Sequence, residues 1–240
     1  SAPELAVSVG AALDGKPDIA IGNVVGSNIA NVLLILGISA LIAPLLVAEQ
    51  IIRQEIPIMI GACVLMLVMA LDGTIQRHEG VILFALVIAY TAFLVRQSRR
   101  ATRETEAEFA DEMPPDSQWD RHWSVQIGLI VAGLVALVIG ADWLVGAAVA
   151  FAQAFGVSDL VIGLTVVAVG TSMPEIATSI VAAIRGQRDI AVGNVVGSNV
   201  FNIFAVIGVT GMISSGGIPV SEAAINFDLW VMVAVALACL

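Results

Sequence analysis

One motif, present twice in the chain, constrains the fold more than any other feature of the sequence. The first copy reads SAPE from residue 1 and continues as GNVVGSNIAN at residues 22–31. The second copy reads GTSMPE at residues 170–175 and continues as GNVVGSNVFN at residues 193–202. With a constant offset of 171 and no gap, 20 of the 37 residues from position 1 are identical to those from position 172. The chain therefore contains two related halves.

Each copy of the motif places a glutamate among apolar residues. Glu175 is the only charged residue between Leu160 and Ile184, and such a run is long enough to cross a bilayer, which takes about 20 apolar residues. A carboxylate in the middle of a span costs about 3 kcal/mol in insertion measurements and marks a candidate functional site. Glu4 is its counterpart in the first copy. We expect the two carboxylates to approach each other near the middle of the membrane.

The composition is that of a membrane protein with several spans. Apolar residues make up 59% of the chain, charged residues 12%, and the mean hydropathy is +0.98, well above an ordinary soluble domain. The net charge of −10 comes without a basic patch, so no nucleic-acid partner is expected, and no protein partner is evident. Cys63 and Cys239 lack the spacing of a disulfide framework or a zinc site. No nucleophile, metal triad or cofactor loop indicates an enzyme, and no cofactor is expected.

The order of apolar and polar segments predicts an all-α protein with two repeats of five transmembrane helices. We expect spans at 19–48, 56–71, 80–95, 123–155, 160–184 and 190–213, half a helix at 1–13, and a last span starting at 227. Residues 49–55 are expected to form an interfacial segment, and Asp142 is expected at the membrane interface. Comparison of the halves predicts that the first and last helices are missing from this chain. We assign residues 1–95 to the first repeat, 96–122 to a cytoplasmic linker and 123–240 to the second repeat.

The number of spans between the two repeats predicts that they have inverted topologies, and the positions of the basic residues agree. Corresponding segments lie five spans apart, an odd number, so they cross the membrane in opposite directions. With the linker in the cytoplasm, only Lys16 and Arg77 of the ten basic residues lie outside, as the positive-inside rule requires. The sequence thus predicts a multi-pass protein of a prokaryotic plasma (inner) membrane.

The polar residues of the repeats predict a cation site. Inverted repeats place substrate sites near the midplane, where helices are interrupted, and a proline precedes each glutamate. Ser27 and Asn31 are four residues apart and share one helix face, as do Ser198 and Asn202. Carboxylate, hydroxyl and amide oxygens suit Na⁺ and also Ca²⁺, which takes about 6–8 oxygen ligands. No neighbouring His or Cys favours a transition metal.

The other residues of the motif admit two interpretations. Gly22 and Gly26, like Gly193 and Gly197, are spaced four apart, which most simply allows another helix to approach closely. Four asparagines either bond between helices or cap broken helices: Asn23, Asn28, Asn194 and Asn199.

The motif Gly-Thr-Ser-x-Pro-Glu followed by Gly-Asn-x-x-Gly-Ser-Asn-x-x-Asn, present twice, resembles the α-repeats of the calcium/cation antiporter superfamily, which includes the sodium/calcium exchangers. The resemblance implies ten spans, a cytoplasmic central loop, and alternating access by sliding of the first and sixth helices. It implies that the ions are bound by the following residues: Glu4, Ser27, Asn31, Thr171, Ser172, Glu175, Ser198, Asn202, and Ser1 as the counterpart of Ser172. Many exchangers have an aspartate in place of one of the paired asparagines, whereas here both Asn31 and Asn202 are amides.

The predicted function is secondary antiport of Ca²⁺ against Na⁺, with both ions as substrates and the lipid bilayer as the environment. A proton-coupled Ca²⁺ exchanger of the same superfamily is the alternative. A cation channel is less favoured, because channels usually repeat around an axis normal to the membrane.

Overall fold

Nearly the whole structure is helical, as the sequence predicts. The computed structural model describes residues 1–42, 44, 48–109 and 123–240. Within these residues, four helices are long and apolar enough to cross a membrane, and a bent pair forms a fifth candidate. Together with the apolar surface of the bundle, these spans make the chain a multi-pass integral membrane protein.

The first half contains a half-length helix followed by three spans. Its elements, in order, are α1 (Ala2–Leu13), α2 (Pro17–Ala30), the π-helical turn η1 (Asn31–Leu36), α3 (Gly37–Ile42), the π-helical turn η2 (Ile51–Glu55), α4 (Ile56–Ala70), β1 (Thr74–Ile75) and α5 (Arg77–Phe109). The turn η2 continues into α4 and belongs to the same candidate span, Ile51–Ala70; the interfacial position of residues 49–55 stays a prediction. Helix α5 extends into the predicted linker, whose residues 110–122 lie outside the described part of the chain.

The second half repeats the order from α1 to α4, preceded by one long helix and a further set of short helical segments. Its elements, in order, are α6 (Trp123–Ala154), α7 (Asp159–Ile162), the π-helical turn η4 (Gly163–Val167), α8 (Ala168–Thr171), α9 (Met173–Ile184), α10 (Arg188–Phe201), the π-helical turn η5 (Asn202–Ile207), α11 (Gly208–Ile213), β2 (Ile218–Pro219), the π-helical turn η6 (Ala224–Asp228) and α12 (Leu229–Leu237). The span that carries Glu175 is broken at Ser172 and bends by 48° there. Asp142 lies on α6, and its side chain is outside the described residues.

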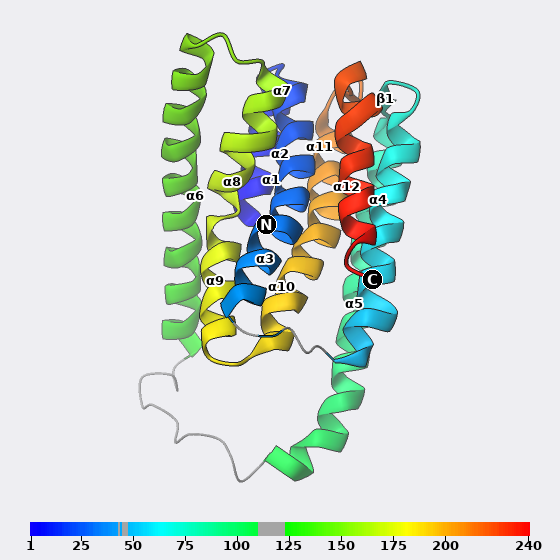
Figure 1. The fold of residues 1–240 in the computed structure, drawn as a ribbon, viewed down its shortest axis with the longest axis vertical. Helices are drawn as coiled ribbons and strands as arrows, with labels where there is room; N and C mark the ends of the chain where they lie inside the picture. Colours follow the sequence, from blue (N-terminus) through cyan, green and yellow to red (C-terminus); the bar gives the residue numbers. More distant parts are fainter. Residues whose placement is uncertain (43, 45–47, 110–122) are drawn as a thin grey trace.

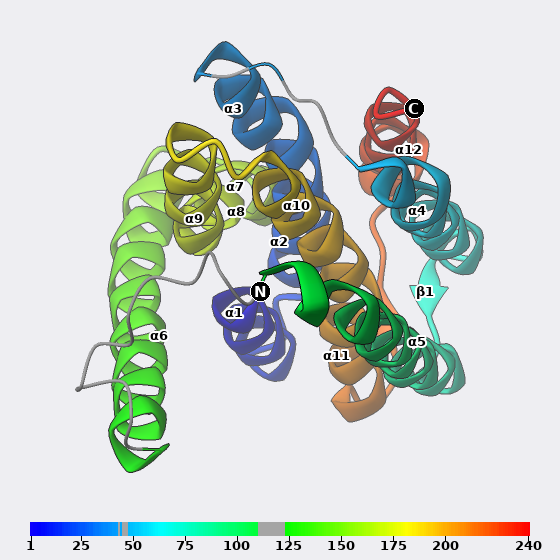
Figure 2. The same ribbon diagram turned by 90° about the horizontal axis from the view of Figure 1, so that it is seen from below.

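Equivalent helices of the two halves run in opposite directions. In Figure 1 the α2–α3 span descends through the bundle, while the α10–α11 span ascends beside it. Helix α1 starts near mid-height and runs upward, whereas α9 starts near mid-height and runs downward. In the view from below, α2 and α10 lie in the middle, with α6 at one edge and α4 and α12 at the other (Figure 2). The predicted inversion of the repeats is therefore visible in the helix directions.

A two-stranded sheet at one end of the bundle was not expected from the sequence. Strands β1 and β2 pair antiparallel, with Thr74 opposite Pro219 and Ile75 opposite Ile218. The Val220 amide also donates to the Gly73 carbonyl at 2.9 Å. These bonds join the turn after α4 to the segment before η6, and so connect the two halves outside the helices.

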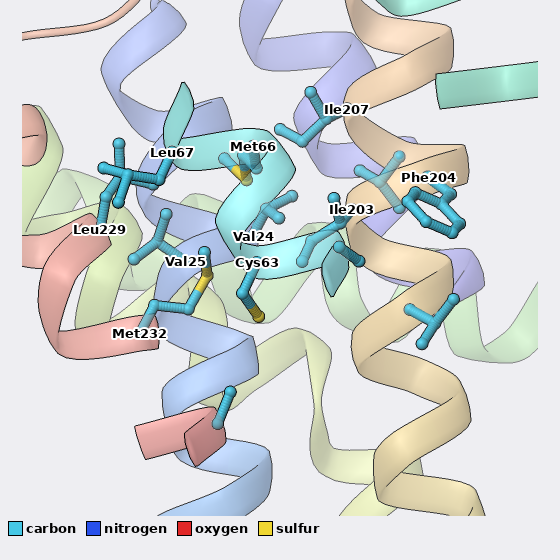
Figure 3. Packing of buried hydrophobic residues seen from close by; sticks show 14 of the residues in the cluster. Val24, Val25, Cys63, Met66, Leu67, Ile203, Phe204, Ile207, Leu229 and Met232 are labelled. Carbon is cyan, nitrogen blue, oxygen red and sulfur yellow. The ribbon is translucent and has the colours of Figure 1, made fainter. Parts of the chain in front are cut away.

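Side chains from both halves form the main hydrophobic core. Figure 3 shows Val24 and Val25 of α2 and Cys63 of α4 packed near Ile203 of η5 and Met232 of α12. The thiols of Cys63 and Cys239 are free, which agrees with the absence of a disulfide framework in the sequence.

The glycine pair of α2 allows close packing against α7 and η4. A Cβ atom added at Gly22 would lie 2.8 Å from the Leu160 carbonyl oxygen, and one at Gly26 would overlap the Leu164 backbone. The packing interpretation of this pair is confirmed. Among the described residues, nothing lies within 4 Å of a Cβ atom added at Gly193 or Gly197, so for that pair the interpretation stays a prediction.

Candidate ion site

Two buried carboxylates lie at the starts of the half-length helices. Glu4 is in the first turn of α1 and Glu175 in the first turn of α9, and each helix has a proline at its N-terminus. Proline fits this position because the first helical N–H has no partner within the helix. Glu4 is 0% exposed and Glu175 is 4% exposed. Both helices start near mid-height in the bundle (Figure 1), so each half contributes one carboxylate from the first turn of a helix.

Each carboxylate is bonded by the serine that precedes the proline of the other repeat. The Ser172 hydroxyl donates to Glu4 Oε1 at 3.1 Å, and the Ser1 hydroxyl donates to Glu175 Oε1 at 3.4 Å. Ser198 adds a 3.5 Å bond to the same Glu175 oxygen. Because Ser172 lies three residues before Glu175 and bonds to Glu4, while Ser1 lies three residues before Glu4 and bonds to Glu175, the predicted approach of the two glutamates is confirmed.

The paired asparagines orient their amide groups by bonds across the repeat interface. Asn202 Nδ2 donates to Ser27 Oγ at 3.1 Å and to Asn28 Oδ1 at 3.1 Å. Asn31 Nδ2 donates to Asn199 Oδ1 at 2.9 Å. With the nitrogen atoms held in this way, the amide oxygens of Asn31 and Asn202 remain free to accept.

Four buried oxygens of this cluster have no hydrogen-bond donor among the described residues: Glu4 Oε2, Glu175 Oε2, Asn31 Oδ1 and Asn202 Oδ1. They form two pairs related by the repeat. A buried acceptor without a partner costs about 1–3 kcal/mol, and more when charged, so each such group in a folded protein requires an explanation. A cation bound by these oxygens supplies one. No cluster of three or more His, Cys, Asp or Glu side chains occurs among the described residues, so an ion here would combine two carboxylates with neutral oxygens.

Thr171 is a predicted ligand whose hydrogen bonds, within the described residues, go to groups other than the two carboxylates. It is fully buried, and its hydroxyl bonds to Asn23 Oδ1 at 3.0 Å and to the Val167 carbonyl at 3.1 Å. Asn23 in turn bonds to the Glu4 carbonyl. In this structure Thr171 is therefore connected to Glu4 through Asn23.

Two serines that the sequence analysis did not single out help to hold the glutamate helices. Asn23 Nδ2 donates to the Glu4 carbonyl at 3.2 Å and to Ser8 Oγ at 2.9 Å. The second repeat makes the same two bonds from Asn194, at 3.3 Å to the equivalent carbonyl and at 2.9 Å to Ser179 Oγ. Ser8 and Ser179 are identical at the offset of 171, and that identity was the available signal. Asn23 and Asn194 thus bond between helices of their own repeat.

Asn28 and Asn199 make a reciprocal bond between the repeats. Asn28 Nδ2 donates to the Asn199 carbonyl at 3.3 Å, and Asn199 Nδ2 donates to the Asn28 carbonyl at 3.2 Å. Of the two interpretations of the asparagines, interhelical bonding is therefore the one the structure supports for all four.

A π-helical turn starts at each of the paired asparagines. Turn η1 begins at Asn31 and turn η5 begins at Asn202. Single π-helical turns within α-helices are rare and occur mostly at functional sites. Their presence at equivalent positions shows that the local geometry of the site is repeated along with its residues.

Comparison with known proteins gives one consistent result. The family described as sodium/calcium exchanger protein matches residues 1–96 and 125–240. CaxA from Alkalimonas amylolytica, described as a candidate antiporter, is 39% identical over 242 residues, which cover 100% of this chain and 74% of that protein. The sodium/calcium exchanger MaX1 from Methanosarcina acetivorans is 33% identical over 268 residues, which cover 99% of this chain and 76% of the relative. A solved structure of the sodium-calcium exchanger NCX_Mj, soaked with Na⁺ and Sr²⁺, superposes with a TM-score of 0.72 at 30% identity, covering 99% of this chain and 73% of that one.

Proposed function

We propose that this chain, which belongs to the sodium/calcium exchanger protein family, exchanges Ca²⁺ for Na⁺ across the membrane. Membership of the family makes it a cation exchanger, and so a transporter and not an enzyme. The choice of Na⁺ as the coupling ion, and the assignment of individual ligands, are our proposal. One relative is the inner membrane protein YrbG of Escherichia coli, 34% identical over 240 residues, and we place this chain in the prokaryotic plasma (inner) membrane.

The four buried oxygens without donors carry the proposal. They come from Glu4, Glu175, Asn31 and Asn202, and they lie where both repeats meet. Two carboxylates supply a charge of −2, which one Ca²⁺ would balance. The hydroxyls of Ser27 and Ser198 lie beside these groups and add neutral oxygens. Together they approach the oxygen count that Ca²⁺ takes in proteins.

The same oxygens suit Na⁺, and this shared use is what exchange requires. If either ion must bind to the carboxylates before the protein can switch the site from one side of the membrane to the other, the two ions compete for the site and their fluxes are coupled. The opposite directions of α1 and α9 (Figure 1) give the site one half-helix toward each side, as expected for alternating access around a fixed central site.

Proton coupling is a second candidate because the charged ligands are two carboxylates. A carboxylate that releases Ca²⁺ can take up a proton in its place, and no additional residue is required for this. The two possibilities differ in which gradient drives Ca²⁺ flux.

The test is Ca²⁺ uptake into proteoliposomes with Na⁺, K⁺ and H⁺ gradients imposed separately. We expect uptake when Na⁺ is inside and Ca²⁺ outside, and no uptake when the Na⁺ gradient is absent. Uptake driven by a proton gradient alone would instead support the proton-coupled alternative. Ca²⁺ flux that needs no ion on the opposite side would indicate a channel and contradict the proposal.

A further inference from the structure

Two additional buried hydroxyls lie outside the central site. Ser39 of α3 and Thr210 of α11 are 0% exposed, and neither hydroxyl has a hydrogen-bond partner among the described residues. The same offset of 171 relates them. A helical serine or threonine commonly bonds to the carbonyl four residues before it, as Ser214 does to the Thr210 carbonyl at 2.8 Å. A matched pair of unpartnered hydroxyls therefore requires an explanation.

The burial of Ser39 runs against the apolar pattern of its own helix. Ser39 is the only fully buried residue of α3, while the neighbouring Leu41 is 88% exposed on the outer surface. A hydroxyl with no specific role would be expected to reach water at the helix end, only three residues away. Instead it points into the protein.

The two hydroxyls lie on opposite sides of the central site. Each follows a paired asparagine by eight residues, which is about 12 Å along a helix. Helix α3 lies in the lower half of the bundle and α11 in the upper half (Figure 1). Helix α3 packs against α9, and α11 packs against α5 and α1, so each hydroxyl is carried by a helix that contacts a glutamate helix of the site.

Along each span an apolar side chain lies between the paired asparagine and the hydroxyl, four residues from each: Ile35 in the first repeat and Val206 in the second. With the residues that pack on it, we call each the apolar layer. On the α3 side, Ile35 and Val195 are 0% exposed and pack with Ile176 of α9. On the α11 side, the equivalent Val206 and Val24 are also 0% exposed and belong to the main core. The order from the centre outward is therefore the same in both directions: amide oxygen, apolar layer, buried hydroxyl.

We propose that Ser39 and Thr210 are outer ligands, each of which binds the transported cation as it passes between water and the central site on its own side of the membrane. This inference rests on the proposed cation exchange. A hydroxyl oxygen is uncharged, so it binds the ion weakly enough for release, which conduction through a series of sites requires. The apolar layer keeps the outer and central sites separate until one side opens.

The test compares Ca²⁺ presented to each face of proteoliposomes that contain protein of a single orientation. Ser39→Ala should raise the apparent KM for Ca²⁺ about threefold or more on the face at which α3 ends. Thr210→Val should do the same on the other face. Loss of one weak ligand is expected to lower the affinity by about this factor. Equilibrium Ca²⁺ binding to the purified protein should stay at the wild-type value in both. Thr210→Ser, which keeps the hydroxyl, should restore the wild-type KM.

Thr165→Val is the matched control. Thr165 lies on the exposed face of η4, and its hydroxyl is already bonded to the Val161 carbonyl at 2.6 Å, so the wild-type KM is expected on both faces. Equal effects of Ser39→Ala on both faces, no effect of either site variant, or a parallel loss of equilibrium binding would overturn the inference. Those outcomes leave wild-type exchange intact, whereas absence of exchange by the wild type in the same vesicles would refute the proposed function itself.

Discussion

Replacing Glu175 with glutamine removes one charge from the site and also reverses the polarity of one ligand atom. Oε1 of Glu175 accepts from the hydroxyls of Ser1 and Ser198. The amide oxygen of a glutamine should therefore take the place of Oε1. Its NH₂ group then replaces Oε2, the atom that has no donor among the described residues, and directs hydrogens toward the ion.

The magnitude follows from the burial of the site. Glu175 is 4% exposed, so water cannot replace the lost charge. Removing one partner of a buried ion pair costs about 3–5 kcal/mol, and the loss should fall in that range. Each 1.4 kcal/mol is a factor of ten in affinity, so Ca²⁺ binding should weaken by about 100- to 4,000-fold.

The assay is Ca²⁺ binding by isothermal titration on purified protein, together with Na⁺-driven Ca²⁺ uptake in proteoliposomes. Glu49→Gln is the matched control, because Glu49 is exposed and, among the described residues, pairs only with Arg53, at 2.6 Å within the same helix. Exposed pairs of this kind contribute about 0–1 kcal/mol, so the control should transport normally. Affinity within threefold of wild type in Glu175→Gln would refute the assignment of Glu175 as a ligand.

Three further outcomes are expected. Gly26→Ala should lower stability by about 1–3 kcal/mol, because the new methyl group overlaps the Leu164 backbone. Gly61→Ala, with open space around it among the described residues, should leave stability unchanged, and thermal unfolding in detergent measures both variants. Asn199→Leu should lower stability by about 1–2 kcal/mol and weaken Ca²⁺ binding, because it removes the acceptor that orients Asn31; unchanged binding would show that this orientation is unimportant. Ca²⁺ at 100 times its Kd should stabilise the wild-type protein by about 2.7 kcal/mol, and a melting temperature independent of Ca²⁺ would argue against a Ca²⁺ site.

Most of the helical architecture could be predicted because apolar length and repeat identity are both explicit in the sequence. The start of the α4 span at Ile51 could not be predicted, because Glu49 and Arg53 interrupt the apolar run. In the structure these charges lie one helical turn apart and pair with each other on an exposed surface, so a helix can contain them. The β1–β2 pair escaped prediction because two-residue strands have no periodicity to recognise.

The residues of the site could be predicted from the sequence, but the hydrogen bonds between them could not. The doubled motif indicated that Glu4 and Glu175 should approach each other, and the crossed serine bonds show that they do. It could not show that Asn202 bonds to Ser27 across the interface, because partners between repeats depend on how the helices cross. The π-helical turns were also not predictable, since a six-residue apolar stretch has the same composition in either helix type. Whether these residues bind the ions remains the proposal tested above.

The reciprocal bonds between Asn28 and Asn199 have the pattern of a contact between two identical subunits. A contact in which residue i bonds to j while j bonds to i is the hallmark of a two-fold symmetric dimer of identical subunits. Here the two partners are equivalent positions of one polypeptide. The two halves of one chain thus meet through a self-complementary surface, of the kind that two identical subunits in opposite orientations would form.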